Sequence, residues 1–75
     1  MNCNDVKPGL RVRTLELHNT TGMLIAAKCL NCRRGGVTGT VNHYVPGHGG
    51  DVWFVVHDGT NEVGAYFFTE LEPCQ

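Results

Sequence analysis

Two cysteines stand at the spacing of a metal-binding or redox motif. Cys29 and Cys32 form a C-x-x-C pair, and two thiolates so spaced can chelate Zn²⁺ when two further ligands arrive. Side chains that could supply those ligands lie elsewhere in the chain, at Cys3, Cys74, His18 and His48. No second C-x-x-C accompanies the pair, so we expect no metal or cofactor, with zinc as the alternative. The two thiols are then expected to pack as small hydrophobic side chains.

Aromatic and basic side chains offer a second kind of chemistry, which is binding. Exposed rings can stack on peptides or bases, and arginines can meet phosphate or acidic groups. The residues that could build such a surface are Trp53, Tyr44, Tyr66, Arg33 and Arg34. They predict a recognition surface for a protein or peptide, and nucleic acid is the alternative partner.

The orientation of Trp53 decides whether that surface exists. The run of residues 52–56, VWFVV, is apolar in both phases of a strand, whereas a half-exposed antiparallel strand alternates with polar residues. If Phe54 faces the core, Trp53 lies on the outer face. Either a second molecule then covers Trp53, which would make a homo-oligomer possible, or the chain's own segment 18–35 covers it.

Two further groups of polar residues could carry a site, and neither predicts catalysis. The glycine-rich stretch 47–51 holds His48 and Asp51 at a flexible hairpin tip, where they could meet a partner or an anion. His57 and Asp58 are neighbours, but the chain contains no Ser, and a capping role for Asp58 in a turn is the simpler explanation. We therefore expect a non-catalytic protein.

Three apolar, β-rich runs must position these side chains. They cover residues 37–45, 52–57 and 63–68, and Asp58-Gly59 between the last two is a strong signal for a hairpin with a type I′ turn. A further strand is predicted over 10–15 and a short last one around Leu71. The pattern indicates an all-β domain built on an antiparallel meander.

A long segment separates the first two predicted strands. Apolar residues at helical spacing predict a short helix over 23–32, with Gly35 as its C-terminal cap.

At 75 residues the whole chain, 1–75, is expected to form one domain. The net charge of −1 disfavours partners that bind mainly through charge. The chain has no apolar run that could cross a membrane and no signal-peptide pattern, so we expect it to be cytoplasmic.

The order of these motifs resembles that of SH3-like small β-barrels. The matching stretches are Pro8-Gly9-x-Arg11-Val12-Arg13, Gly39-Thr40-Val41, Val52-Trp53-Phe54-Val55, His57-Asp58-Gly59, Tyr66 and Glu70-Leu71-Glu72-Pro73. The resemblance, shared with short uncharacterised bacterial and mobile-element proteins, implies a five-stranded barrel with a long first loop that holds a short helix. Such barrels serve as peptide binders, as chromatin readers and as KOW modules that bind RNA.

One enzyme family is similar in length and layout, the type II dihydrofolate reductases, which assemble around a central pore. Their Val-Gln-Ile-Tyr run corresponds here to Val63-Gly64-Ala65-Tyr66, from which the Gln and Ile are missing. The leading hypothesis is therefore a non-catalytic interaction module. The alternatives are a KOW-like accessory protein that binds nucleic acid and, more distantly, an oligomeric reductase of this kind.

Overall fold

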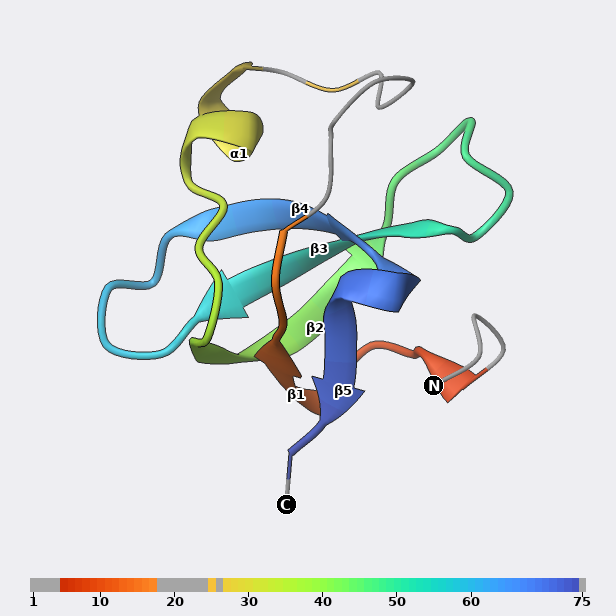
Figure 1. The fold of residues 1–75 in the computed structure, drawn as a ribbon. Coiled ribbons are helices and arrows are strands. Elements are labelled where there is room, and N and C mark those ends of the chain that lie inside the picture. The colour runs from red at the N-terminus through yellow and green to blue at the C-terminus, as the bar shows by residue number, and fades with distance from the viewer. Residues whose placement is uncertain (1–4, 18–24, 26, 75) are drawn as a thin grey trace.

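The computed structural model describes residues 5–17, 25 and 27–74 (Figure 1). Its strands form one antiparallel sheet in the order β4-β3-β2-β1-β5, which confirms the predicted all-β class. The sheet curls on itself, but its edge strands β4 and β5 do not pair, so it is not closed. The elements follow one another as β1 (Arg11–Thr14), α1 (Ala27–Asn31), β2 (Thr38–Tyr44), β3 (Val52–His57), β4 (Val63–Phe67), the 3-10 helix η2 (Phe68–Glu70) and β5 (Leu71–Pro73).

The β3–β4 hairpin forms as predicted, but its turn is longer than the type I′ turn expected at Asp58-Gly59. The backbone N–H of His57 donates to the carbonyl of Glu62 at 2.8 Å, so the loop runs over residues 58–61. Positive φ angles occur at Gly59 (83°) and Asn61 (59°) and not at Asp58. Asn61 tolerates this conformation better than most residues that carry a side chain. The prediction of a type I′ turn is therefore wrong, although Gly59 does occupy a left-handed position.

A β-bulge changes the phase of β2 near its end. Val41 pairs with Val55, but Tyr44 pairs with Trp53, so β2 contains one more residue than β3 over this interval. Asn42 and the two residues after it are all exposed as a result. The bulge ends the simple alternation of faces that the sequence predicts for residues 37–45.

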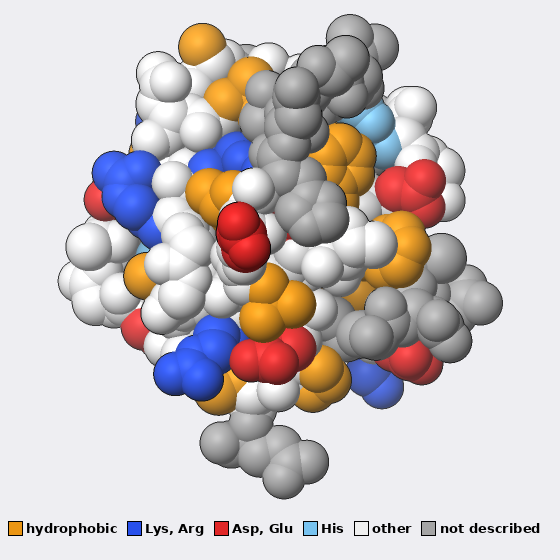
Figure 2. All heavy atoms as spheres, viewed as in Figure 1, with side chains coloured by type: hydrophobic (Ala, Val, Ile, Leu, Met, Phe, Trp, Pro, Cys, Tyr) orange, Lys and Arg blue, Asp and Glu red, His pale blue; other side chains and the backbone are white. Residues whose placement is uncertain are grey.

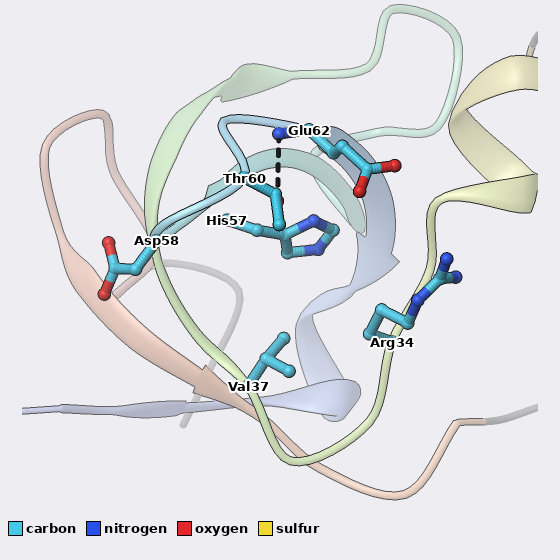
Figure 3. A pocket seen from close by; sticks show the side chains of 6 residues that line it. All are labelled: Arg34, Val37, His57, Asp58, Thr60 and Glu62. Carbon is cyan, nitrogen blue, oxygen red and sulfur yellow. Dashed lines mark hydrogen bonds between the residues drawn. The ribbon is translucent and has the colours of Figure 1, made fainter.

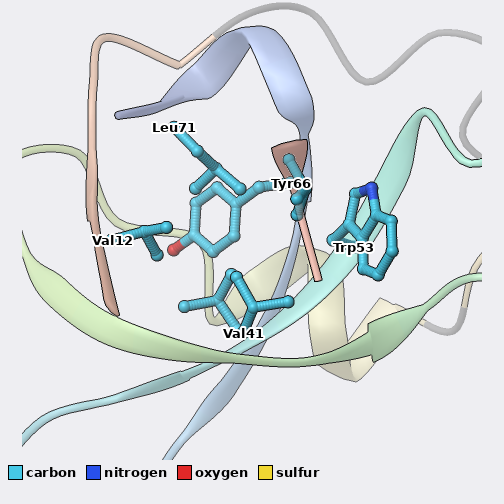
Figure 4. Packing of buried hydrophobic residues seen from close by; sticks show 7 residues of the cluster. Val12, Val41, Trp53, Tyr66 and Leu71 are labelled. Carbon is cyan, nitrogen blue, oxygen red and sulfur yellow. The ribbon is translucent and has the colours of Figure 1, made fainter. Parts of the chain in front are cut away.

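The main core lies inside the curve of the sheet. It is built from Val6, Val12, Val41, Trp53, Val55, Tyr66 and Leu71 (Figure 4). Trp53 and Val55 therefore point into this core, and the proposed arrangement with Phe54 inside and Trp53 outside is wrong. Trp53 is 8% exposed, and its indole N–H donates to the carbonyl of Gly50 at 2.7 Å.

The opposite face of β3 and β4 is covered by the segment that carries α1. Its partly buried side chains Ile25, Cys29 and Leu30 pack on a second cluster that includes Val52 and Phe54. Both faces of β3 are thus covered within one chain, which explains why its sequence is apolar in both phases. The described part of the long segment, residues 25 and 27–35, thus packs on the face of Phe54, whereas Trp53 lies in the core on the other face.

The helix is shorter than predicted at its C-terminal end. It ends at Asn31, and the guanidinium of Arg34 donates to the carbonyl of Asn31 at 3.0 Å, which satisfies one of the unpaired groups at a helix end. Gly35 is therefore not the cap. The N-terminal part of the predicted helix, at 23, 24 and 26, lies outside the described residues. Across the part of the chain that the structure describes, no helix has the length and apolar character needed to cross a bilayer.

Candidate binding pocket

A buried chain of hydrogen bonds runs from the core to one end of the sheet. Its centre is the hydroxyl of Tyr66, a residue with no exposed surface. That oxygen lies 2.6 Å from Nε2 of His57, accepts the backbone N–H of Arg34 at 2.7 Å, and lies 3.2 Å from the Arg34 carbonyl. The contacts tie β4 to β3 and to the segment after α1.

Gly64 makes room for this arrangement. A Cβ atom at this position would lie 2.9 Å from the ring of Tyr66 and 3.2 Å from Cε1 of His57. Real Cβ atoms essentially never come as close as the first of these distances. A side chain at Gly64 would therefore push the two rings apart, so the glycine is needed for close approach.

His57 is neutral in this environment. Its side chain is buried, and burial lowers its pKa below the ordinary 6.5, an effect that the charge of Glu62 partly opposes. The Tyr66 hydroxyl, which accepts the N–H of Arg34, has two acceptors within reach of its own proton: Nε2 of His57 at 2.6 Å and the carbonyl of Arg34 at 3.2 Å.

A buried ion pair covers the free edge of β4. Alternate residues of this strand bond to β3, and the backbone groups of Ala65 and Phe67 face away from it. Arg33 donates to the carbonyl of Ala65 at 2.9 Å, and the carboxylate of Glu70 accepts the N–H of Phe67 at 2.8 Å. Arg33 and Glu70 also pair directly with each other, and both are buried. Their side chains occupy the place of a neighbouring strand where the sheet fails to close.

Beside this network a pocket of about 210 Å³ opens between the segment after α1 and the β3–β4 turn (Figure 3). It is lined by Arg34, Val37, His57, Asp58, Thr60 and Glu62. Figure 3 shows the imidazole of His57 pointing into the space between Arg34 and Glu62. The pocket thus combines an apolar wall, an imidazole and side chains of both charge signs.

The two carboxylates of the pocket, Asp58 and Glu62, differ in the hydrogen-bond donors that they contact. Asp58 accepts from Arg11 at 2.8 Å and from Thr38 at 2.8 Å, and the Arg11 contact is the main reason that its pKa falls to about 2. Glu62 accepts only the thiol of Cys32, at 3.2 Å, among the side chains of the described chain. The charge of Asp58 is therefore balanced by Arg11, while Glu62 retains capacity to accept further hydrogen bonds.

The predicted aromatic and basic surface does not assemble as one face. Trp53, Tyr66 and Arg33 are buried, whereas Tyr44 is 54% exposed and touches Trp53 edge-on with a centroid distance of 6.1 Å. The guanidinium of Arg33 instead lies over the ring of Tyr66, with its Cζ 5.4 Å from the ring centroid, so Arg33 belongs to the buried network. Of this predicted set, Arg34 alone lines the pocket.

The other predicted binding residues lie in the β2–β3 loop, away from the pocket lining. His48 is half-buried, Asp51 is exposed, and the backbone N–H of Asp51 donates to the carbonyl of His48 at 3.1 Å. The carbonyl of Asp51 in turn accepts the N–H of Phe68 at 2.8 Å, which ties this loop to η2. The two residues lie together, but in a loop distinct from the pocket.

The cysteines of the C-x-x-C pair have separate surroundings. Cys29 packs on the outer cluster of the sheet, and Cys32 donates its thiol to Glu62, a bond that raises the pKa of Cys32 and disfavours the thiolate that metals bind. Among residues 5–17, 25 and 27–74, no three His, Cys, Asp or Glu side chains are grouped to hold a metal ion. Cys3 and His18 lie outside the described residues.

Sequence reasoning gave a binding role to Arg34 alone among the residues that line the pocket, and it missed the other five and Glu70 of the adjoining network. His57 follows Trp53 and Val55 in phase, so placing those two inside the curve would have placed His57 there as well. Glu70 and Glu62 gave no such signal, because a glutamate near a strand end is ordinarily solvated.

No protein-family model, curated protein sequence or solved structure shows a significant match to this chain. The resemblance to SH3-like barrels, to KOW modules and to the type II reductases therefore stays a prediction from the sequence. In this chain the run that corresponds to the reductase motif contributes mainly to the interior: Gly64, Ala65 and Tyr66 are buried, and Val63 is partly exposed.

Proposed function

We propose that the protein is a non-catalytic interaction module that accepts one side chain of a partner peptide or protein in the pocket beside His57. The observation that carries this proposal is the pocket itself, about 210 Å³ in volume and lined from two separate segments. Sites for whole drug-sized ligands measure roughly 300–1,000 Å³, so this pocket suits a single side chain rather than a larger molecule.

The surroundings of the pocket favour recognition over chemistry. Its walls are held by buried contacts, since Tyr66 fixes both His57 and the backbone of Arg34. A site held in place before binding loses little conformational entropy when the ligand enters. Among the described residues, the side chain that bonds to His57 is the phenol of Tyr66, and no serine hydroxyl or cysteine thiol does so.

A displayed peptide library tests the proposal. Peptides enriched on the wild-type protein should bind it with a measurable dissociation constant. They should bind Thr60→Phe at least roughly tenfold more weakly, because the larger side chain would occupy the pocket. Thr60 is exposed, so this substitution leaves the core intact.

Thr69→Phe is the matched control, because Thr69 is an equally exposed threonine that lies in η2, outside the pocket lining. Peptides that bind both variants as tightly as the wild type would place the site elsewhere. A library from which no peptide is enriched would refute the proposal.

A further inference from the structure

Resting on the proposed function, we infer that the group which the pocket takes is an uncharged primary amide, as in the side chain of Asn or Gln. Three features of the pocket carry this inference: one directed donor, one acceptor with spare capacity, and balanced charge.

The donor is Nδ1 of His57. We take the Tyr66 hydroxyl to donate to Nε2, which at 2.6 Å is the nearer of its two acceptors, the other being the Arg34 carbonyl at 3.2 Å. In that tautomer Nδ1 carries the ring hydrogen and needs an acceptor. No side chain or backbone group of the described residues bonds to Nδ1. The imidazole points into the pocket, so a ligand carbonyl can meet this hydrogen (Figure 3).

The acceptor is the carboxylate of Glu62. Its one side-chain donor among the described residues is the thiol of Cys32, a weak donor at 3.2 Å. The negative charge of Glu62 acts on His57, so the two side chains face the same space. An N–H of the ligand can therefore bond to Glu62 while a carbonyl of the same group bonds to His57.

The charges that line the pocket select against an ionic ligand. Asp58 is balanced by Arg11, and the positive charge of Arg34, whose Nη1 donates to the carbonyls of Asn31 at 3.0 Å and Arg33 at 2.9 Å, is opposed by the negative charge of Glu62. A ligand carboxylate would meet Glu62, and a ligand ammonium would meet the N–H of His57. An amide satisfies both groups, and Val37 supplies an apolar wall for its hydrocarbon part.

The volume is adequate for such a group. A cavity of about 150 Å³ is known to admit a benzene ring. The pocket measures about 210 Å³, which leaves room for an amide and its stem.

Three small probes of similar shape test the inference: isobutyramide, isobutyrate and isobutylamine. Each is titrated into the ¹⁵N-labelled protein while the backbone amide signals of Thr60 and Glu62 are followed. We expect isobutyramide to bind roughly tenfold more tightly than either ion, because each ion leaves one polar group of the pocket unpaired. Equal or tighter binding of an ion would overturn the amide assignment and leave the pocket as a binding site.

Glu62→Gln supplies the second measurement. The variant keeps the size of the side chain but removes its charge, so isobutyrate should gain affinity and the preference for the amide should fall. Glu16→Gln, at an exposed residue outside the pocket lining, should keep the wild-type preference. An unchanged preference in Glu62→Gln would overturn the role given to Glu62.

The outcome also separates this inference from the proposed function. If none of the probes shifts the pocket signals while library peptides bind and depend on Thr60, the amide assignment fails alone. If neither probes nor peptides bind, both fail.

Discussion

At the scale of single residues, one phenol organises the interior end of the pocket. The hydroxyl of Tyr66 accepts the backbone N–H of Arg34 and contacts Nε2 of His57, which leaves Nδ1 as the ring nitrogen open to a ligand in the proposed site. Burial raises the pKa of Tyr66, so the phenol stays protonated and keeps its donor role across the physiological range. The chemistry that the pocket presents therefore depends on a residue that does not line it.

The state of His57 makes stability depend on pH. Its folded pKa lies below the unfolded value of 6.5, so the unfolded state binds more protons in the interval between them. The stabilisation is complete above pH 6.5 and is lost as the pH falls toward the folded pKa. We expect the free energy of unfolding, measured by urea titration, to decrease between pH 7 and pH 5. His57→Gln should flatten this dependence.

His43→Gln is the control for that experiment, because His43 is exposed and lies at the bulge of β2. It should retain the wild-type slope. A wild type whose unfolding free energy does not change over this interval would contradict the neutral, buried state of His57. The loss linked to Asp58 comes at lower pH, because it begins as the pH falls through the unfolded pKa of 3.8 and continues to the folded pKa of about 2.

At the scale of elements, the edge of β4 shows how a sheet that does not close satisfies its backbone. An uncovered edge leaves N–H and C=O groups that invite pairing with another chain. Here Arg33 bonds to the carbonyl of Ala65 and Glu70 to the N–H of Phe67, in place of a strand. Arg33 is thus a structural residue of the fold rather than part of a recognition surface.

Breaking that pair should cost much more than removing an exposed charge. Arg33→Met leaves the buried carboxylate of Glu70 without its cation, and we expect the free energy of unfolding to fall by roughly 3–5 kcal/mol. The double variant Arg33→Met/Glu70→Gln should recover part of this loss, since no buried charge then remains unpaired. Urea denaturation measures both.

The exposed Arg13 of β1 offers the comparison. Arg13→Met should change the stability by no more than about 0.5 kcal/mol. If Arg33→Met behaved in the same way, the ion pair at the edge of β4 would contribute nothing to the fold.

The elements also show how far the sequence could predict this molecule. The residue types of 52–57 and 63–67 predicted their strands well, because β-branched and aromatic runs bounded by turn residues are local signals. The direction of Trp53 could not be predicted locally, since both phases of that run are apolar. The bulge of β2 and the contact of Arg33 with Glu70 depend on residues far apart in the chain, and no short pattern contains them.

At the scale of the whole molecule, basic and acidic side chains are nearly equal in number. The chain has six Lys and Arg against seven Asp and Glu. Two of its arginines are paired with carboxylates of the same chain, Arg11 with Asp58 at the surface and Arg33 with Glu70 in the interior. On the face shown in Figure 2, blue and red side chains lie interspersed and form no field of one sign. Such a surface provides little of the phosphate attraction on which nucleic-acid binding depends.

We therefore expect weak binding to nucleic acid, which tests the KOW-like alternative directly. Fluorescence anisotropy with a single-stranded RNA and a DNA duplex should give dissociation constants above about 10⁻⁶ M at physiological salt. The affinity should change little as salt is lowered, because few phosphates would be neutralised. Submicromolar binding with a steep salt dependence would favour the alternative. Arg34→Ala removes an exposed cation and leaves the buried Arg33 in place. If this variant lost the nucleic-acid binding, the binding site would lie on the side of the molecule that carries the pocket.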